Sequence, residues 1–327
     1  MPASPLDRYT IDSELGRGAM GVVYLAHDQK IDRQVALKEL LLVENLTPAV
    51  RQELMDRFDR EARAAGRLNH PNIVGVYDVF TDRERSFIVM EYLDGETLAD
   101  ILERGPLDAD SAAAVTLQVL NAVAHAHANQ VIHRDLKPDN VFILKDGAVK
   151  VTDFGIAHIG DPSASLTRAG TILGTVGYMS PEQLRGEPID ERSDIFAIGV
   201  MLYEMLAGRV PWEGDNALSV MSQHISAPVP PLHEINSAVP PPIEGIIRKC
   251  LRKNPDERYE DATSLLKDLQ NWRDLPLSQF IFGDEQTIAP PGNSDLKLIL
   301  LIFGISAAFL TASIFLLVLA YLINHAH

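Results

Sequence analysis

The sequence predicts an α+β fold of two lobes, with a small lobe rich in β-strands, a larger helical lobe and one C-terminal transmembrane helix. Three observations favour this fold class. Strand-like runs fill most of residues 9–93, and helical periodicity dominates residues 94–274. Residues 298–323 then form an apolar run without a charge. A chain of 327 residues is long enough to bury a core of this size.

Composition narrows the classes of function. The 29 basic and 45 acidic residues give a net charge of −16, which argues against non-specific nucleic-acid binding. Cys250 is the only cysteine, so an internal disulfide and a cysteine-based metal site are excluded. This cysteine usage fits a reducing cytosol for the globular part.

The first lobe is predicted to be mostly β-structure. Runs of β-branched and aromatic residues, bounded by turn residues, indicate strands, and one helical stretch over about 49–68 interrupts them. The expected strands include GVVYLAHD (21–28), QVALKEL (34–40), NIVGVYDVF (72–80) and SFIVMEYL (86–93).

Helices are predicted to dominate the second lobe. One begins near Asp110 and continues to about residue 128. Residues 193–208, SDIFAIGVMLYEMLAG, are apolar nearly all round, as expected of a helix buried within a domain. The last globular helix lies in residues 261–274. The apolar face of the first of these helices carries Ala113, Leu117, Leu120 and Ala124.

The C-terminal residues predict a membrane anchor. Residues 275–297 contain Pro, Gly and Ser without a sustained period, which indicates a juxtamembrane linker. The 26 residues 298–323 would span about 39 Å as a helix, enough to cross a ~30 Å hydrocarbon layer with some tilt. A buried core helix is the alternative, but such helices are usually shorter and carry a polar stripe. Only the short tail 324–327 follows.

A glycine-rich turn precedes the first predicted strand. Gly16, Gly18 and Gly21 match G-x-G-x-x-G, but a strand pattern follows them, whereas a helix follows in a dinucleotide-binding unit. Free amides in such a turn can point at phosphate oxygens. An ordinary hairpin turn remains the alternative.

Lys38 stands at the centre of an apolar strand. An ammonium buried there needs a partner, and the following helix offers Glu61. Alternatively, Lys38 emerges on the solvent face of the strand.

Residues 131–140, VIHRDLKPDN, concentrate charge between two apolar runs. A solvated turn is rarely flanked on both sides by apolar residues. The flanks therefore place His133, Arg134, Asp135 and Lys137 at the mouth of a buried element.

Five runs resemble one known family. GRGAMGVVY, VALKEL, HRDLKPDN, DFG and SPE occur in the order and approximate spacing of the eukaryotic-type protein kinases. Over residues 9–274 the chain resembles a bacterial membrane-anchored Ser/Thr protein kinase. The resemblance implies a bilobal protein kinase fold, with lobes at about 9–93 and 94–274. It also implies ATP- and Mg²⁺-dependent phosphoryl transfer to Ser and Thr hydroxyls of proteins in bacterial signalling, with Mn²⁺ as a possible replacement for Mg²⁺.

Matching positions imply roles for the site residues. Asp135 would accept and orient the substrate hydroxyl proton, and Lys137 would stabilise charge near the γ-phosphate. Asn140 and Asp153 would hold Mg²⁺ through hard oxygen atoms. The triphosphate would lie under Gly16, Gly18 and Gly21, and its α- and β-phosphates would be bound by Lys38, which Glu61 aligns. The adenine would lie between Val23 and Ala36 above and Phe142 below. Met90 would close the back of the pocket, and Glu91 and Leu93 would belong to the linking strand.

Some of the matched residues could serve, or would serve, to hold the fold together. Val23, Ala36 and Phe142 could equally be core residues. Glu182 of SPE would pair with Arg258, and Asp194 would brace the backbone of the catalytic loop.

Regulation is expected in the activation segment, residues 153–182. Arg134 precedes Asp135, and in kinases with this pair the arginine often binds a phosphate on that segment. Thr167 and Thr171 are the predicted autophosphorylation sites. Thr175 would instead contact the catalytic loop. Hydroxyl side chains are also common in loops without any regulatory role, and this interpretation is preferred for Ser163 and Ser165.

The expected location is the cell (inner) membrane, crossed once, with the kinase domain in the cytoplasm. Lys297 before the apolar run agrees with the positive-inside rule. Gly304, Ala308 and Ala312 recur every four residues and suggest a homodimer through this helix, although small residues are frequent in membrane helices. The other expected partners are protein substrates and the membrane. No nucleic-acid partner is expected.

Two other functions compete with a protein kinase. A membrane-bound pseudokinase scaffold would be favoured by loss of Lys38, Asp135 or Asp153, and all three are present. A kinase for small molecules such as sugars or antibiotics is disfavoured by the complete activation segment and SPE, since a small acceptor needs no peptide platform.

Overall fold

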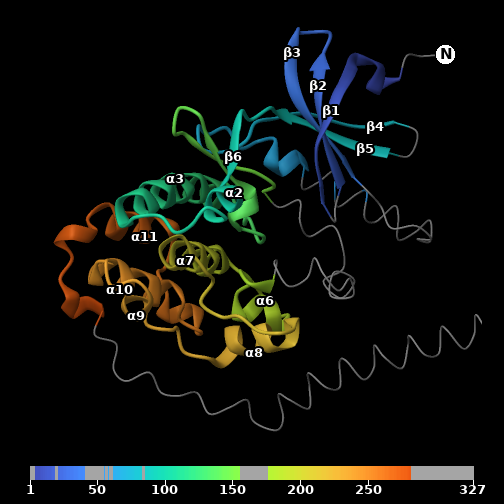
Figure 1. The fold of residues 1–327 in the computed structure, drawn as a ribbon. Coiled ribbons are helices and arrows are strands. Elements are labelled where there is room, and N and C mark those ends of the chain that lie inside the picture. The colour runs from blue at the N-terminus through green and yellow to red at the C-terminus, as the bar shows by residue number, and fades with distance from the viewer. Residues whose placement is uncertain are drawn as a thin grey trace, which may run out of the picture. The chain divides into compact units, whose positions relative to one another are not determined.

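A five-stranded antiparallel sheet forms the first lobe (Figure 1). The structure is a computed structural model that describes residues 4–18, 21–40, 55, 58, 62–82, 85–154 and 176–280. All of these lie within one compact unit, residues 1–282. The strands are β1 (Tyr9–Gly18), β2 (Gly21–Asp28), β3 (Arg33–Leu40), β4 (Val76–Asp82) and β5 (Arg85–Glu91), in the spatial order β1-β2-β3-β5-β4.

The alternation of side chains along β3 decides which residues face the site. Val35 and Leu37 are fully buried in the core on one face of the sheet, with Phe87 and Val89 of β5. Because neighbouring side chains of a strand point to opposite faces, Ala36 and Lys38 share the other face. The register pairs Val23 of β2 with Lys38.

A second, smaller sheet belongs to the other lobe. It contains β6 (Gly95–Thr97), β7 (Val141–Leu144) and β8 (Val149–Val151) in that spatial order. Ile73 of the first lobe pairs in parallel with Val151 of β8. The two lobes are therefore joined by backbone pairing as well as by the chain that leaves β5.

Helices build the rest of the second lobe. The helices are α2 (Leu98–Leu102), α3 (Ala109–Ala128), α6 (Pro181–Arg185), α7 (Arg192–Ala207), α8 (Ala217–Ser226), α9 (Leu232–Ile235), α10 (Pro241–Cys250) and α11 (Ala262–Gln270). Single 3₁₀ turns occur at η1 (Pro5–Arg8), η2 (Pro138–Asn140), η4 (Pro255–Glu257), η5 (Trp272–Asp274) and η6 (Leu277–Phe280).

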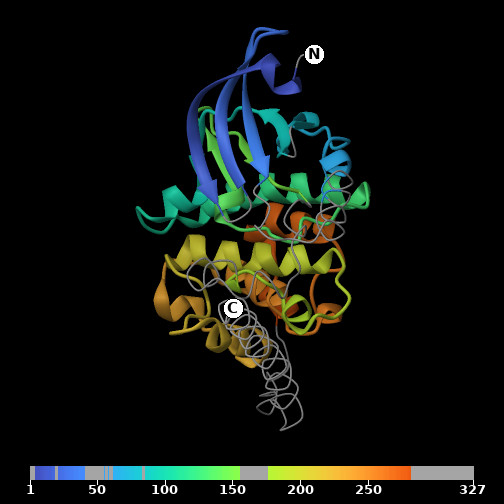
Figure 2. The same cartoon turned by 90° about the vertical axis from the view of Figure 1, so that its right-hand side faces the viewer.

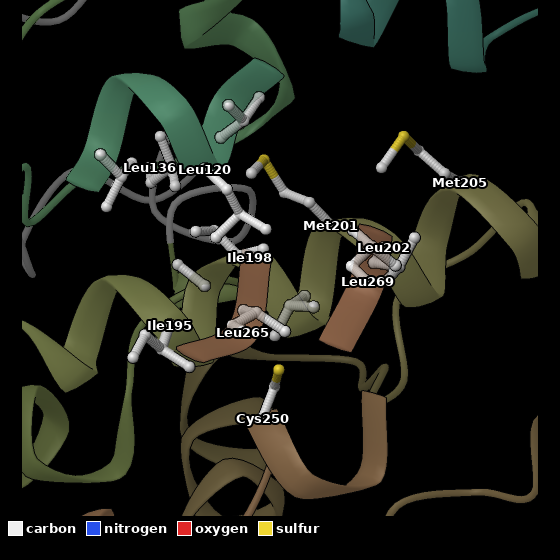
Figure 3. Close-up of a cluster of buried hydrophobic side chains, with 14 of the residues drawn as sticks. Leu120, Leu136, Ile195, Ile198, Met201, Leu202, Met205, Cys250, Leu265 and Leu269 are labelled. Carbon is white, nitrogen blue, oxygen red and sulfur yellow. The ribbon is translucent and has the colours of Figure 1, made fainter. Parts of the chain in front are cut away.

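Helix α7 forms the centre of this lobe. Thirteen of its sixteen residues are buried, which confirms the prediction of a helix covered on all sides. It lies beside α3 in both views (Figures 1 and 2). Figure 3 shows the core where its side chains meet those of α3 and α11. The labelled core residues are Leu120, Leu136, Ile195, Ile198, Met201, Leu202, Met205, Cys250, Leu265 and Leu269.

Helix α3 confirms the predicted helix and the side of it that faces the core. Asp108 caps the N-terminus by accepting hydrogen bonds from the backbone N–H groups of Asp110 and Ser111. Of the predicted stripe, Ala113 and Leu120 are buried, whereas Leu117 and Ala124 are only half-buried. The buried surface of α3 is wider than the predicted stripe, because α3 packs against α7, α11 and β8 at once.

The second lobe extends past residue 274. Leu275 and Phe280 pack against its core, so the first residues of the expected linker lie on this lobe. The predicted transmembrane helix, residues 298–323, lies outside the described residues. Within the described part of the chain, no helix is long and apolar enough to cross a membrane.

Candidate active site

The catalytic loop is held by a carboxylate of helix α7. Asp194 accepts hydrogen bonds from the backbone N–H groups of His133 (2.8 Å) and Arg134 (2.9 Å), which confirms the predicted bracing role. His127 of α3 contacts the same carboxylate through Nε2 at 2.8 Å. Burial raises the pKa of Asp194, but these hydrogen bonds and the nearby imidazoles outweigh it and hold the pKa below its ordinary value. The loop is therefore tied to an ionised side chain in the core.

His133 joins the catalytic loop to the segment that carries Asp153. Its Nδ1 accepts a hydrogen bond from the backbone N–H of Asp135 at 3.3 Å, so the ring proton is on Nε2, which donates to the carbonyl oxygen of Thr152 at 2.8 Å. The ring also packs against Phe154, with centroids 4.6 Å apart. His133 therefore fixes the distance between the catalytic loop and the DFG motif.

Asp135, Lys137 and Asn140 converge within the loop. Nζ of Lys137 lies 3.1 Å from Oδ2 of Asp135. The amide nitrogen of Asn140 donates to the carbonyl oxygen of Asp135 at 2.7 Å and reaches its Oδ2 at 3.3 Å. The side chains of Asp135 and Lys137 are 17% and 19% exposed, so both can be reached by a ligand but are oriented by neighbours. A carboxylate and an ammonium in contact can receive a hydroxyl and a phosphate together.

Lys38 of the first lobe meets Asp153 of the second. Nζ of Lys38 donates to Oδ1 of Asp153 at 2.6 Å, across 115 residues of sequence. Burial raises the pKa of Asp153, but the Lys38 ammonium outweighs burial and the pKa is lowered, so the carboxylate is ionised at neutral pH. Glu61, the predicted partner of Lys38, lies outside the described residues.

Two residues of the site have left-handed backbone conformations. Arg134 has φ of +69° and Asp153 has φ of +61°. Side chains other than glycine rarely adopt this region, and such strain is concentrated at functional sites. Here the strain lies one residue before Asp135 and at the predicted metal ligand itself.

The glycine-rich turn joins two antiparallel strands, as predicted. A Cβ at Gly21 would lie 2.2 Å from the carbonyl oxygen of Glu39, so the approach of β2 to β3 requires glycine there. A Cβ at Gly16 or Gly18 would meet no described atom within 4 Å. Packing with the described residues therefore explains Gly21 only, and the phosphate role stays a prediction for all three.

Most of the predicted adenine-pocket residues form one apolar cluster. Ala36 and Met90 are buried in it, and Val23 and Leu93 pack against them. Val74 is a fifth member that the sequence reasoning missed, although it lies in a predicted strand. Phe142 is half-buried on β7 of the other lobe, where it pairs with Thr97 and Lys150. The side chain of Glu91 turns to Lys150.

The donor set fits ATP with Mg²⁺. Because the amide nitrogen of Asn140 faces Asp135, its amide oxygen faces away and is available to a cation. Asp153 supplies an ionised carboxylate, and Lys38 and Lys137 supply positive charge for phosphates. Among the described residues, no three His, Cys, Asp or Glu side chains form a metal cage. Mg²⁺ is commonly bound by one or two protein groups together with substrate phosphates.

The sequence matches a known protein family. The family model described as protein kinase domain matches residues 9–269. The chain belongs to the protein kinase family. The kinase motifs quoted from the sequence all lie within the matched residues.

Similar proteins include kinases of bacteria. The chain is 43% identical over 264 residues to serine/threonine-protein kinase PrkC of Bacillus subtilis, covering 80% of this chain and 40% of the relative. It is 40% identical to serine/threonine-protein kinase PknL of Mycobacterium tuberculosis, covering 80% of this chain and 65% of the relative. The chain thus spans about two fifths to two thirds of these proteins. The crystal structure of a point mutant of the Mycobacterium tuberculosis PknI kinase domain is similar with a TM-score of 0.63 and 26% identity, over 81% of this chain and 96% of that chain.

The C-terminal end of the activation segment is described, whereas residues 155–175 are not. Glu182 forms a bidentate pair with Arg258, at 2.7 and 2.8 Å, which confirms the predicted pairing. Gln183 donates to the carbonyl oxygen of Arg134 at 2.8 Å, a contact that the sequence reasoning missed. The predicted phosphorylation sites Thr167 and Thr171 lie outside the described residues, as do Thr175 and the loop serines Ser163 and Ser165.

Proposed function

We propose that this chain transfers the γ-phosphoryl group of ATP, in the presence of Mg²⁺, to Ser and Thr hydroxyls of proteins. The 2.6 Å contact between Lys38 and Asp153 carries the proposal, because it brings a predicted phosphate-binding cation and a predicted metal ligand together from opposite lobes. Family membership and the names of the bacterial relatives support the same activity.

Each side chain of the site has a task in this transfer. When bound, ATP would supply the phosphoryl group and Mg²⁺ would neutralise part of its charge. Asn140 and Asp153 would hold the metal, and Lys38 would hold the phosphates. Asp135 orients the acceptor hydroxyl and takes its proton on the carboxylate, which Asn140 fixes from behind. Lys137 lies beside that carboxylate and stabilises negative charge on the group being transferred.

Regulation by autophosphorylation is part of the proposal. The guanidinium Nε of Arg134 is buried without a hydrogen-bond partner among the described residues. This fits an arginine that binds a phosphate group on the activation segment. Thr167 and Thr171 are the proposed acceptors. Phosphosite mapping of active protein that finds both threonines unmodified would end this part of the proposal.

Residues 298–323 are proposed to anchor the kinase in the cell membrane, with the catalytic domain in the cytoplasm where ATP is available. The uncharged run of 26 residues supports this. The small residues Gly304, Ala308 and Ala312 would bring two helices together in a homodimer. Unchanged self-association of the Gly304→Ile, Ala308→Ile double variant in detergent would rule out that interface.

Phosphate transfer from labelled ATP tests the activity. The full chain in mild detergent is incubated with Mg²⁺, ATP and a generic basic protein, beside Lys38→Met. Labelled phosphoserine or phosphothreonine formed by the wild type, and at least about a hundredfold less by the variant, would support the proposal. Nucleotide binding without any transfer would favour a scaffold, and transfer to a sugar or antibiotic but not to protein would favour a small-molecule kinase.

A further inference from the structure

A lysine of β8 forms an ion pair with the last residue of β5. Nζ of Lys150 lies 2.8 Å from Oε2 of Glu91, at the end of β5, and 3.4 Å from the carbonyl oxygen of Ile73. The same Oε2 accepts a hydrogen bond from the backbone N–H of Gly75 at 3.1 Å. The side chains of Lys150 and Glu91 are only 15% and 28% exposed. This ion pair is therefore largely shielded from water and from salt.

Three segments meet at this ion pair. Residues 72–75 pair with β8 through Val151 N–H to Asn72 O (2.8 Å) and Val74 N–H to Val151 O (3.0 Å). They also pair with β5 through Glu91 N–H to Gly75 O (2.8 Å). The ammonium of Lys150 adds a bond to residues 72–75, at the carbonyl oxygen of Ile73, and a bond to β5, at the carboxylate of Glu91. The junction thus consists of residues 72–75, the end of β5 and the whole of β8.

Each of these segments leads directly to a residue of the site. β5 continues into residues 91–93, the strand predicted to border the adenine, and β8 is followed by Asp153 two residues after Val151. Val74 contributes its side chain to the apolar cluster with Ala36 and Met90. The ion pair consequently sets the position of residues 91–93, which are predicted to border the adenine, relative to Asp153, the predicted metal ligand.

We propose that Lys150 is a positioning residue for nucleotide binding. Its bond to Glu91 holds the linking strand at a set distance from Asp153, so that one ATP molecule can contact both. In this role Lys150 acts through Glu91. The proposal rests on the proposed function, since it assigns a role within the same site.

Another lysine of the same hairpin gives a matched control. Lys145, in the turn between β7 and β8, also pairs with a carboxylate, Asp94, at 2.7 Å. The side chains of this pair are largely in solvent, 76% and 62% exposed, and Asp94 bonds no part of residues 72–75 in the described structure. Lys145→Met removes the same charge from the same hairpin without touching the junction.

The test compares Lys150→Met, Lys150→Arg and Lys145→Met in the full chain. We expect the KM for ATP of Lys150→Met to rise about threefold to tenfold with kcat within about twofold, because the lost contact affects binding before the chemical step. Lys150→Arg should recover most of the affinity, since the cation is kept, and Lys145→Met should change the KM by less than about twofold. A milder Lys150→Gln replaces Lys150→Met if its unfolding temperature shows a folding defect.

Binding is measured in parallel so that the two proposals can fail separately. The Kd of a fluorescent ATP analogue with Mg²⁺ should rise with the KM across the series. If the wild type transfers no phosphate, the proposed function is wrong, and the Kd series still decides the role of Lys150. An unchanged KM and Kd in Lys150→Met, an equal change in Lys145→Met, or a loss confined to kcat would overturn the inference.

Discussion

Three ion pairs connect residues that are far apart in the sequence: Lys38–Asp153, Glu182–Arg258 and Lys150–Glu91, separated by 115, 76 and 59 positions. Each pair joins a segment that carries functional residues to the rest of the fold. Removing one partner of a shielded pair leaves a charge without compensation, which costs more than the intact pair contributes. At the scale of single residues, these pairs set the geometry of the site.

The pair of Glu182 and Arg258 makes the clearest stability prediction. Glu182 is 3% exposed and also accepts a hydrogen bond from Ser193 at 2.7 Å. Glu182→Gln would leave the Arg258 guanidinium buried without its counter-charge. We expect a loss of about 3–5 kcal/mol in the free energy of unfolding, measured by denaturant titration at pH 7.

The control for this variant is Glu187→Gln, which removes the exposed partner of Arg185 and should cost less than about 1 kcal/mol. Burial raises the pKa of Glu182, but Arg258 outweighs burial and brings it to about 2, below the ordinary 4.5. The stabilisation is therefore complete above about pH 4.5 and is lost as the pH falls towards 2. Equal stability losses for both variants at pH 7 would contradict the account.

At the scale of elements, α7 supports the functional segments from several points along its length. Asp194 near its start braces the catalytic loop, and Glu204 near its end accepts a hydrogen bond from Tyr178 at 2.6 Å. Between them, Gly199 lies against α10. Burial raises the pKa of Glu204, as expected for a carboxyl group in the interior of the lobe. The position of α7 therefore determines the position of both the loop and the peptide platform.

Gly199 lets α7 and α10 approach closely. A Cβ there would lie 2.6 Å from Cβ of Cys250 and 3.1 Å from Cδ2 of Leu251. Helix propensity alone predicts that Gly199→Ala would stabilise the protein by about 1 kcal/mol. We expect the opposite, a net loss of about 1–3 kcal/mol, because the helices must separate to admit the methyl group. A raised unfolding temperature would show that the helices are not in close contact.

His224 of α8 makes part of the stability depend on pH. Its Nδ1 donates to the carbonyl oxygen of Met179 at 2.9 Å, and Trp212 packs on the ring with centroids 4.7 Å apart. Burial, with a smaller effect of Lys253, lowers the pKa of His224 from 6.5 to about 4. The folded protein therefore keeps this ring neutral at pH values where the unfolded chain is protonated.

The sign of the effect follows from this difference. The contribution of neutral His224 to the free energy of unfolding is complete above pH 6.5. Up to about 3 kcal/mol of it is lost as the pH falls towards 4. We expect the stability of His224→Gln to depend less on pH than that of the wild type between 6.5 and 4. Chemical denaturation at several pH values measures this, and parallel curves for the two proteins would refute the assignment.

At the scale of the whole molecule, local pattern predicted the elements and the tertiary structure decided their partners. The strand predicted at residues 21–28 has the observed bounds of β2, and α7 is buried as its composition indicated. The contact of Lys38 with Asp153 could not be predicted from periodicity, because it depends on how two lobes close on each other. Val74, His127 and Lys150 were missed for the same reason: each gains its role from a neighbour distant in sequence. The five kinase motifs nevertheless predicted Asp135, Lys137, Asn140 and Asp153 as residues of the site.

The most direct test of the account replaces the predicted catalytic carboxylate and nothing else. Asp135→Asn keeps the size of the side chain, and Asp146→Asn, at an exposed aspartate of the β7–β8 turn, is the matched control. The rate of Ser/Thr phosphorylation from ATP and Mg²⁺ is measured for both, with nucleotide affinity measured beside it. We expect Asp135→Asn to bind ATP normally and to lose about a hundredfold to ten-thousandfold in rate, while Asp146→Asn is unaffected. Transfer by Asp135→Asn within about tenfold of the wild type would contradict the assignment of this loop as the catalytic centre.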